Sequence, residues 1–124
     1  MLPISRTLLG TTAALTLVLA GTAALAAMPE MQLNGDAEAG KEVAMDRSRG
    51  NCIACHLIPG GDSPGAIGPA LVAIQTRYPS KEDLAKQIWD PTVKNPEAVM
   101  PPFGKYGILS DKEFVDVVEF IWSQ

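Results

Sequence analysis

The stretch that sets the fold is Cys52-Ile53-Ala54-Cys55-His56, a C-x-x-C-H run. Such a run is the attachment signature of a c-type haem. Two thiols three positions apart on one helical turn can reach the two vinyl groups of a single porphyrin, and the next residue then directs its imidazole towards the iron. His56 is the only histidine in the chain. The sequence therefore predicts covalent haem c at Cys52 and Cys55, with His56 as an axial ligand of the iron.

Two cysteines can also serve in a redox pair, a structural zinc site or a disulfide, and the sequence favours none of these three. A thioredoxin-like redox pair is expected in a βαβ context, and the pattern shows none. A structural zinc site needs four ligands, whereas Cys52, Cys55 and His56 supply three and the chain has no further Cys or His. A disulfide between Cys52 and Cys55 would close a loop too short to stabilise the fold much. Haem attachment is the favoured hypothesis.

The second axial position of the iron is filled by a methionine or left open, because the only histidine is already used. Met28 and Met31 precede the expected helices, and Met45 lies on the first of them. Met100 lies in an irregular stretch, Val99-Met100-Pro101-Pro102-Phe103-Gly104, whose prolines would stiffen the segment that holds the sulfur on the iron. Met100 is the predicted ligand. A thioether ligand raises the reduction potential, which suits an electron acceptor rather than an oxygen activator.

Further residues are expected to shape the haem pocket. A backbone carbonyl at Gly68-Pro69 could accept the Nδ1–H of His56 and fix its tautomer and ring plane, although Pro69 is also typical of a helix start. Phe103 is the favoured aromatic wall because it lies close to Met100. The other candidates are Tyr78, Trp89 and Trp122 for the wall, and Arg47, Arg49 and Lys105 for the haem propionates.

Residues 1–26 are expected to be a cleaved signal peptide. Arg6 and the free amine give a positive n-region, an apolar run over residues 8–23 follows, and Ala24-Leu25-Ala26 is an A-x-A cleavage site. A retained membrane anchor is the alternative, because the run is about long enough to span a bilayer. Cleavage would export the mature chain to the periplasm, and no later segment is apolar enough to give the mature form a membrane span.

The remainder of the chain is predicted to be all-α. Residues 27–35 are expected to be a flexible lead-in, and residues 36–124 a single domain. Its expected helices run from the N-cap Asp36 to about Arg47, over residues 69–77, from Ser80 to the Asp90-Pro91 break, and from the capping box Ser110-Asp111-Lys112-Glu113 onwards. The formal net charge of −4 argues against a nucleic-acid partner.

Several blocks of the sequence together resemble class I cytochromes c. They are Asp36-Ala37-Glu38-Ala39-Gly40-Lys41, the C-x-x-C-H run, Ile67-Gly68-Pro69 and Met100-Pro101. Two more blocks, Gln87-Ile88-Trp89-Asp90-Pro91 and Val99-Met100-Pro101-Pro102-Phe103-Gly104, narrow the resemblance to the SoxX family, the small cytochrome subunits of the bacterial sulfur-oxidation (Sox) system. The resemblance extends from about Asp36 to Trp122. Some relatives carry an extra segment before the haem motif, which this chain almost lacks.

The resemblance implies a cytochrome c domain over residues 36–124, with three to four short helices and irregular loops around one covalently bound haem. His56 and Met100 would be its axial iron ligands. It also implies a periplasmic electron-transfer subunit that forms a heterodimer with a larger haem protein, SoxA.

Such complexes oxidatively couple thiosulfate to a cysteine of the carrier protein SoxYZ, an L-cysteine S-thiosulfotransferase-type reaction, and electrons leave towards a soluble cytochrome c. The sulfur chemistry is attributed to the larger subunit, so this chain is expected to hold no catalytic nucleophile. The alternative is a free monohaem cytochrome c that shuttles electrons between respiratory or photosynthetic complexes.

Overall fold

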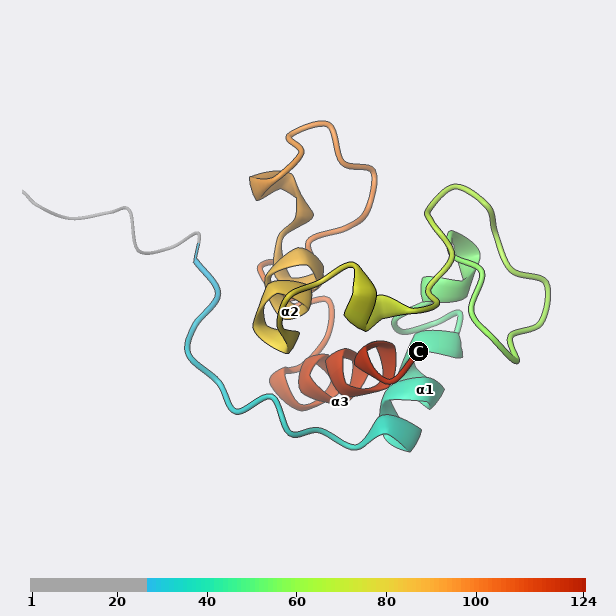
Figure 1. The fold of residues 1–124 in the computed structure, drawn as a ribbon, viewed down its shortest axis with the longest axis horizontal. Helices are drawn as coiled ribbons and strands as arrows, with labels where there is room; N and C mark the ends of the chain where they lie inside the picture. The colour runs from blue at the N-terminus through green and yellow to red at the C-terminus, as the bar shows by residue number, and fades with distance from the viewer. Residues whose placement is uncertain (1–26) are drawn as a thin grey trace, which may run out of the picture.

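The computed structural model describes residues 27–124, which form three α-helices joined by long loops (Figure 1). The α-helices are α1 (Ala37–Met45), α2 (Lys81–Trp89) and α3 (Asp111–Trp122). Single 3-10 turns lie in the connections: η1 (Cys52–Ala54), η2 (Ile74–Thr76) and η3 (Pro91–Val93). Residues 27–124 contain no strand, which confirms the all-α prediction for them. The predicted signal peptide lies outside the described residues.

Each α-helix begins at a side-chain cap that the sequence predicts. Asp36 caps α1 by accepting hydrogen bonds from backbone N–H groups of the first turn. Ser80 caps α2 through the N–H of Asp83. At the start of α3, Ser110 and Glu113 exchange the two reciprocal bonds of a capping box. A cap of this kind typically stabilises a helix by about 1 kcal/mol.

The first helix is slightly shorter than predicted, because it ends at Met45 rather than at about Arg47. Asp46 leaves the helical conformation, with φ of −71° and ψ of 117°. Its carboxylate accepts a hydrogen bond from the backbone N–H of Ser48 at 2.8 Å. This carboxylate therefore stabilises the turn that leads the chain away from α1.

The prediction of a helix over residues 69–77 is wrong for most of that range. Only η2 forms there. The N–H of Leu71 donates to the carbonyl of Leu57 at 2.8 Å, so it is unavailable to a local helix. Ala73 adopts a left-handed conformation with φ of +50°, which an α-helix cannot include. Contacts with a distant segment therefore override the local helical pattern.

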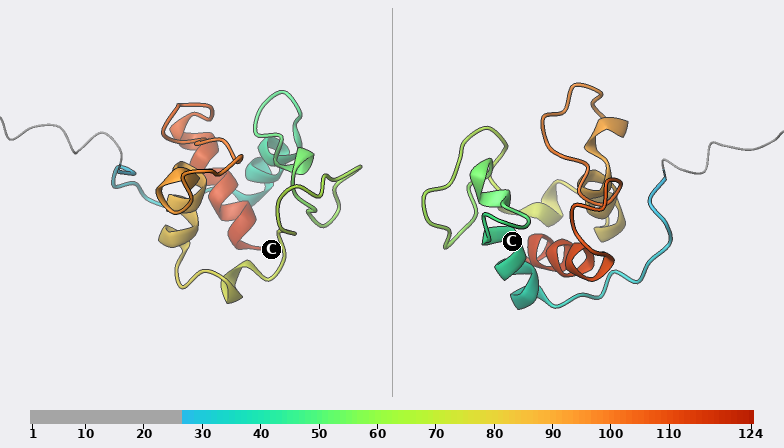
Figure 2. Two further views of the ribbon diagram at one scale, coloured as in Figure 1. Left: turned by 90° about the horizontal axis from the view of Figure 1, so that it is seen from above. Right: turned by 180° about the vertical axis from the view of Figure 1, so that it is seen from behind.

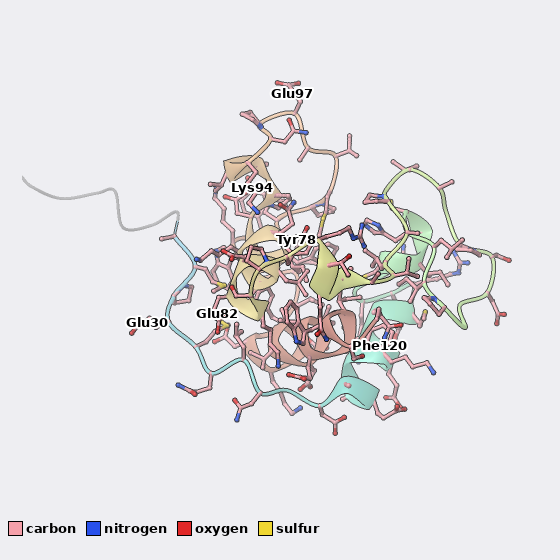
Figure 3. The ribbon with its side chains drawn as sticks, in the orientation of Figure 1. Glu30, Tyr78, Glu82, Lys94, Glu97 and Phe120 are labelled. Carbon is pink, nitrogen blue, oxygen red and sulfur yellow. The ribbon has the colours of Figure 1, made fainter. Side chains whose placement is uncertain are left out.

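Helix α3 lies between α1 and α2, and its closest partner is α1 (Figure 2). Gly40 allows the two backbones to approach, because a Cβ there would lie 1.9 Å from the carbonyl oxygen of Asp116. Figure 3 shows Phe120 on α3 beside α1. The N–H of Asp36 also donates to the Asp116 carboxylate at 2.9 Å. The start of α1 is thus attached to α3 by both packing and a hydrogen bond.

The hydrophobic core fills the space between the helices. The four α3 residues that the helical spacing predicts to face inwards, namely Phe114, Val117, Val118 and Ile121, are at most 3% exposed. Trp89 of α2 meets Phe114 edge-on, with ring centroids 5.3 Å apart. Within residues 27–124, no helix combines the length and apolar character needed to cross a bilayer.

The lead-in, residues 27–35, has no regular secondary structure and runs past α2 and α3 to the start of α1 (Figure 1). Met28, Met31 and Leu33 nevertheless pack against the core. The carbonyl of Leu33 accepts a hydrogen bond from the ammonium of Lys81 at 3.2 Å. The segment therefore covers part of the core, and its flexibility stays a prediction.

Candidate haem-binding site

The C-x-x-C-H run and the predicted methionine ligand open onto the same cavity, whose volume is about 570 Å³. Cys52, Cys55, His56 and Met100 all contribute to its wall. Much of the remaining wall is apolar and comes from the helices and the connection before α2: Leu71, Ile74, Leu84, Ile88, Val117 and Ile121. Pockets for cofactors are typically about 300–1,000 Å³ and mainly apolar, so this cavity has the size and lining of a cofactor site.

The two thiols are presented by a single 3-10 turn. The N–H groups of Cys55 and His56 both donate to the carbonyl of Cys52, at 3.2 and 3.0 Å. Side chains three positions apart eclipse each other in a 3-10 turn, which places both thiols on one side. Ile53, between them, is 3% exposed and packs into the protein. The turn therefore directs both sulfurs into the cavity and anchors itself on the opposite side.

His56 is oriented by Gly68 and Pro69, at the end of the loop that follows the C-x-x-C-H run. Its Nδ1 lies 2.6 Å from the carbonyl oxygen of Pro69. Because a carbonyl only accepts, Nδ1 carries the proton and Nε2 keeps its lone pair free for a metal. A Cβ at Gly68 would lie 2.3 Å from the imidazole Cε1, so the ring requires a glycine here. The N–H of Gly68 donates to the carbonyl of Cys55 at 2.8 Å, which holds this contact in place.

Met100 reaches the cavity from a different part of the chain, the loop over residues 91–105. Figure 1 shows this loop and the loop after η1 projecting separately from the helical core. Met100 is half-buried and Phe103, also in the cavity wall, is 8% exposed. In Figure 3, Glu97 lies at the outer tip of the loop and Lys94 lies nearer its base, above Tyr78. The ammonium of Lys94 is 5.5 Å from the centre of that ring.

The prediction of an aromatic pocket wall is wrong for two of its four residues. Tyr78 and Phe103 line the cavity as predicted, but Trp89 and Trp122 lie outside its wall. A Cβ added to Gly104 would lie 1.9 Å from Cε3 of Trp89, so this indole packs on the loop backbone instead. Trp122 packs against the core at the end of α3. Both tryptophans therefore support elements that carry the pocket.

Two of the predicted propionate partners line the cavity and one does not. Arg47 and Arg49 are in the wall, and Nε of Arg49 is already paired with the Asp46 carboxylate at 2.7 Å. Lys105 lies outside the wall, and its ammonium is 2.6 Å from the buried carboxylate of Asp90. The prediction for Lys105 is wrong because this ion pair turns the side chain to the base of the loop.

Sequence reasoning missed Arg77, which lines the cavity. Its guanidinium donates to the carbonyls of Ala70 at 2.8 Å and Val72 at 3.1 Å. Both carbonyls lie within three residues after Pro69, so Arg77 holds the segment that orients His56. Nothing in the local sequence predicts the role, because the partners are backbone groups that any residue type would offer.

The site disfavours the other uses of the two cysteines. Burial raises the pKa of the Cys52 thiol to about 11, whereas redox-active cysteines need a lowered pKa to form the thiolate. Both thiols are free. Among residues 27–124, no three His, Cys, Asp or Glu side chains gather into a cluster that would hold a metal ion directly.

Comparison with known proteins agrees with this geometry. Residues 37–124 match the family model for cytochrome c. The chain belongs to the cytochrome c family. Its structure is similar to the crystal structure of SoxXA from P. pantotrophus, with a TM-score of 0.63 and 26% identity over 70% of this chain and 80% of that chain.

One curated relative is an uncharacterized lipoprotein of Aquifex aeolicus (strain VF5). It is 31% identical over 77 residues, which cover 59% of this chain and 36% of that protein. The chain therefore spans little more than a third of the length of this relative.

The family and the fold together make covalent haem c, with its iron, the cofactor of this chain. The residues present fit that group: two thiols on one turn, an imidazole with a free Nε2, and an apolar cavity of about 570 Å³. The similarity to SoxXA supports the resemblance of the chain to SoxX.

Proposed function

We propose that this chain is the electron-transfer subunit of a SoxXA-like complex that oxidatively couples thiosulfate to a cysteine of a SoxYZ-like carrier protein. The similarity to SoxXA over 80% of the compared chain is the observation that carries the proposal. The complex would lie in the periplasm, reached through the cleaved signal peptide predicted for residues 1–26. A SoxA-like haem subunit would complete the heterodimer, and a soluble cytochrome c would accept the electrons.

The proposed site residues divide into covalent, ligating and shaping groups. Cys52 and Cys55 would hold the haem as thioethers, and His56 and Met100 would supply the nitrogen and sulfur ligands of the iron. Bound in this way, haem c supplies one-electron redox chemistry at a raised potential, as thioether ligation gives. If His56 and Met100 both ligate the iron, they would leave no position for a substrate, and the sulfur chemistry would belong to the partner.

The chain's own residues prepare the site for electron transfer. The carbonyl of Pro69 lies 2.6 Å from Nδ1 of His56 and holds the proton there, which would leave Nε2 to face the iron. Phe103 and the apolar wall keep water away from the ligands, which lowers the local dielectric constant and influences the potential.

Reductive titration of the holoprotein, with and without a co-expressed SoxA-like haem chain, tests the proposed function. We expect the two chains to purify as a stable complex and the potential of this haem to differ between free and bound forms. Deletion of this chain should also abolish thiosulfate oxidation by the cell. A lone monomer that exchanges electrons rapidly with an oxidase, and whose deletion leaves thiosulfate oxidation unchanged, would instead identify a free electron shuttle.

A further inference from the structure

Asp90 connects the two ends of the loop that carries Met100. Its side chain is at the end of α2, is 3% exposed and lies outside the cavity wall. One oxygen, Oδ1, accepts the N–H of Thr92 at 3.1 Å and also the Thr92 hydroxyl. The other oxygen, Oδ2, accepts from the ammonium of Lys105 at 2.6 Å. A single buried carboxylate thus fixes both the start and the end of residues 91–105.

Other contacts hold the same two ends of the loop but leave its middle free. The N–H of Lys105 donates to the carbonyl of Trp89 at 3.2 Å, and Gly104 packs directly on the Trp89 indole. Within residues 27–124, the backbone groups of Val99 and Met100 make no hydrogen bond. Val99 is also 81% exposed. The position of the Met100 sulfur is therefore set mainly by the closed ends of the loop and by the prolines that follow it.

We propose that Asp90 is a positioning residue for the Met100 thioether, which it acts on through the ends of the loop without touching the haem. The inference rests on the proposed role of Met100 as an iron ligand. Buried hydrogen bonds to a carboxylate are stronger than neutral ones, so their loss should free the loop base. The sulfur would then leave the iron more often, although it would still be bound most of the time.

Asp116 provides a matched control within the same chain. It is 4% exposed, its carboxylate pairs with Lys112 at 2.6 Å, and it accepts the N–H of Asp36 at 2.9 Å. It lies on α3 and makes no contact with the loop over residues 91–105 through these bonds. Asp90→Asn and Asp116→Asn therefore each remove one buried charge with a similar set of partners, and only the first affects the loop.

The experiment measures how fast imidazole replaces the methionine in the ferric holoprotein. At saturating imidazole, the rate is limited by dissociation of the sulfur from the iron. We expect Asp90→Asn to raise this rate by about tenfold, as the loss of a charged hydrogen bond allows. Asp116→Asn should stay within about twofold of the unsubstituted protein, since distant sites act independently. Both variants should lower the urea midpoint of unfolding.

Lys105 variants keep the test decisive if Asp90→Asn yields no folded holoprotein. Lys105→Gln leaves the Thr92 cap intact and should also accelerate imidazole entry. Lys105→Arg retains the ion pair and should restore the original rate. If the Asp90 and Lys105 variants bind imidazole no faster than Asp116→Asn, the inference is wrong.

Met100→Ala separates this failure from a failure of the ligand assignment. The variant should lose the near-infrared sulfur–iron charge-transfer band and bind imidazole without the slow step. If it keeps the band, Met100 is not the ligand, and the proposed role of Asp90 fails with it. If it loses the band while Asp90→Asn behaves like Asp116→Asn, the ligand assignment stands and only the role of Asp90 is wrong.

Discussion

At position 68, the contact with His56 leaves no room for a side chain. The Cβ of Gly68→Ala would lie 2.3 Å from the imidazole Cε1, so either the ring or the segment must move. We expect a loss of about 1–3 kcal/mol in the free energy of unfolding, as overpacking usually gives. The visible spectrum of the haem should also change, because the ring plane of its ligand shifts. Urea unfolding and absorption spectroscopy measure the two effects.

Gly60→Ala is the control for this substitution. Gly60 has φ of +75° and no atom within 4 Å of an added Cβ. The alanine should therefore destabilise the protein by about 1 kcal/mol through backbone strain alone and leave the haem spectrum unchanged. An equal spectral change in both variants would show that contact with His56 is not the cause.

At the residue scale, the sequence predicts the residues that would bind the haem better than the residues that hold them in position. The C-x-x-C-H spacing predicts the turn that directs Cys52 and Cys55 into the cavity, and elimination leads to Met100, which lines the same cavity. Arg77 and Asp90 could not be assigned in this way. Arg77 binds backbone carbonyls, and Asp90 pairs with the ammonium of Lys105, 15 positions along the chain, so only the folded chain brings these groups together.

At the scale of single elements, the capping box of α3 should contribute measurably to stability. Ser110→Ala removes the acceptor for the Glu113 N–H and one side of the reciprocal pair. We expect the free energy of unfolding to fall by about 1 kcal/mol, measured by urea denaturation of the holoprotein. Ser123→Ala removes a hydroxyl bond to the Phe120 carbonyl and the bond that the hydroxyl accepts from the Gln124 amide at the end of the chain's last helix, and it should cost less. An equal loss in both variants would contradict the role of the cap.

Local signals predict an element well where the element depends on local bonds. All three α-helices begin at predicted caps, because a cap is made by residues two or three positions apart. The helix predicted over residues 69–77 is wrong because its backbone serves distant partners. The N–H of Leu71 pairs with Leu57, and the N–H of Ile74 donates to the carbonyl of Gln124 at 3.0 Å. No local pattern reports such pairings.

For the whole molecule, the buried carboxylates of Asp90 and Asp116 make the free energy of unfolding depend on pH. The hydrogen bond from Lys105 is the largest influence that lowers the pKa of Asp90. Burial acts to raise the pKa of Asp116, but the Asp36 N–H and the Lys112 ammonium outweigh it and keep that pKa below its usual value. Because both groups are more acidic when folded, their stabilisation is present above the ordinary aspartate pKa of 3.8 and is lost as the pH falls.

The urea midpoint of the holoprotein should therefore change little between pH 7 and pH 5 and should fall below about pH 4. Asp116→Asn should show a shallower fall, because one of the linked groups no longer titrates. Unfolding curves at a series of pH values provide the measurement. A midpoint that rises on acidification would contradict the linkage.

The haem should be part of the core of the whole molecule. Without it, the chain would leave about 570 Å³ of largely apolar space unfilled, and unfilled core space costs about 24 cal/mol per Å³. This upper limit, on the order of 10 kcal/mol, matches the entire stability of a small domain. We expect the double variant Cys52→Ala, Cys55→Ala to lose its near-ultraviolet circular dichroism. Met100→Ala, which keeps the covalent haem, should still unfold cooperatively; a folded double variant would contradict this prediction.

The near-infrared spectrum of the ferric holoprotein tests the proposed iron ligation. The sulfur–iron charge-transfer band should be present in the unsubstituted protein and lost in Met100→Ala. It should persist in Met45→Ala, because Met45 lies on α1 and outside the cavity wall. If the band is absent from the unsubstituted protein, or survives in Met100→Ala, the proposed His56 and Met100 ligation of an electron-transfer haem is wrong.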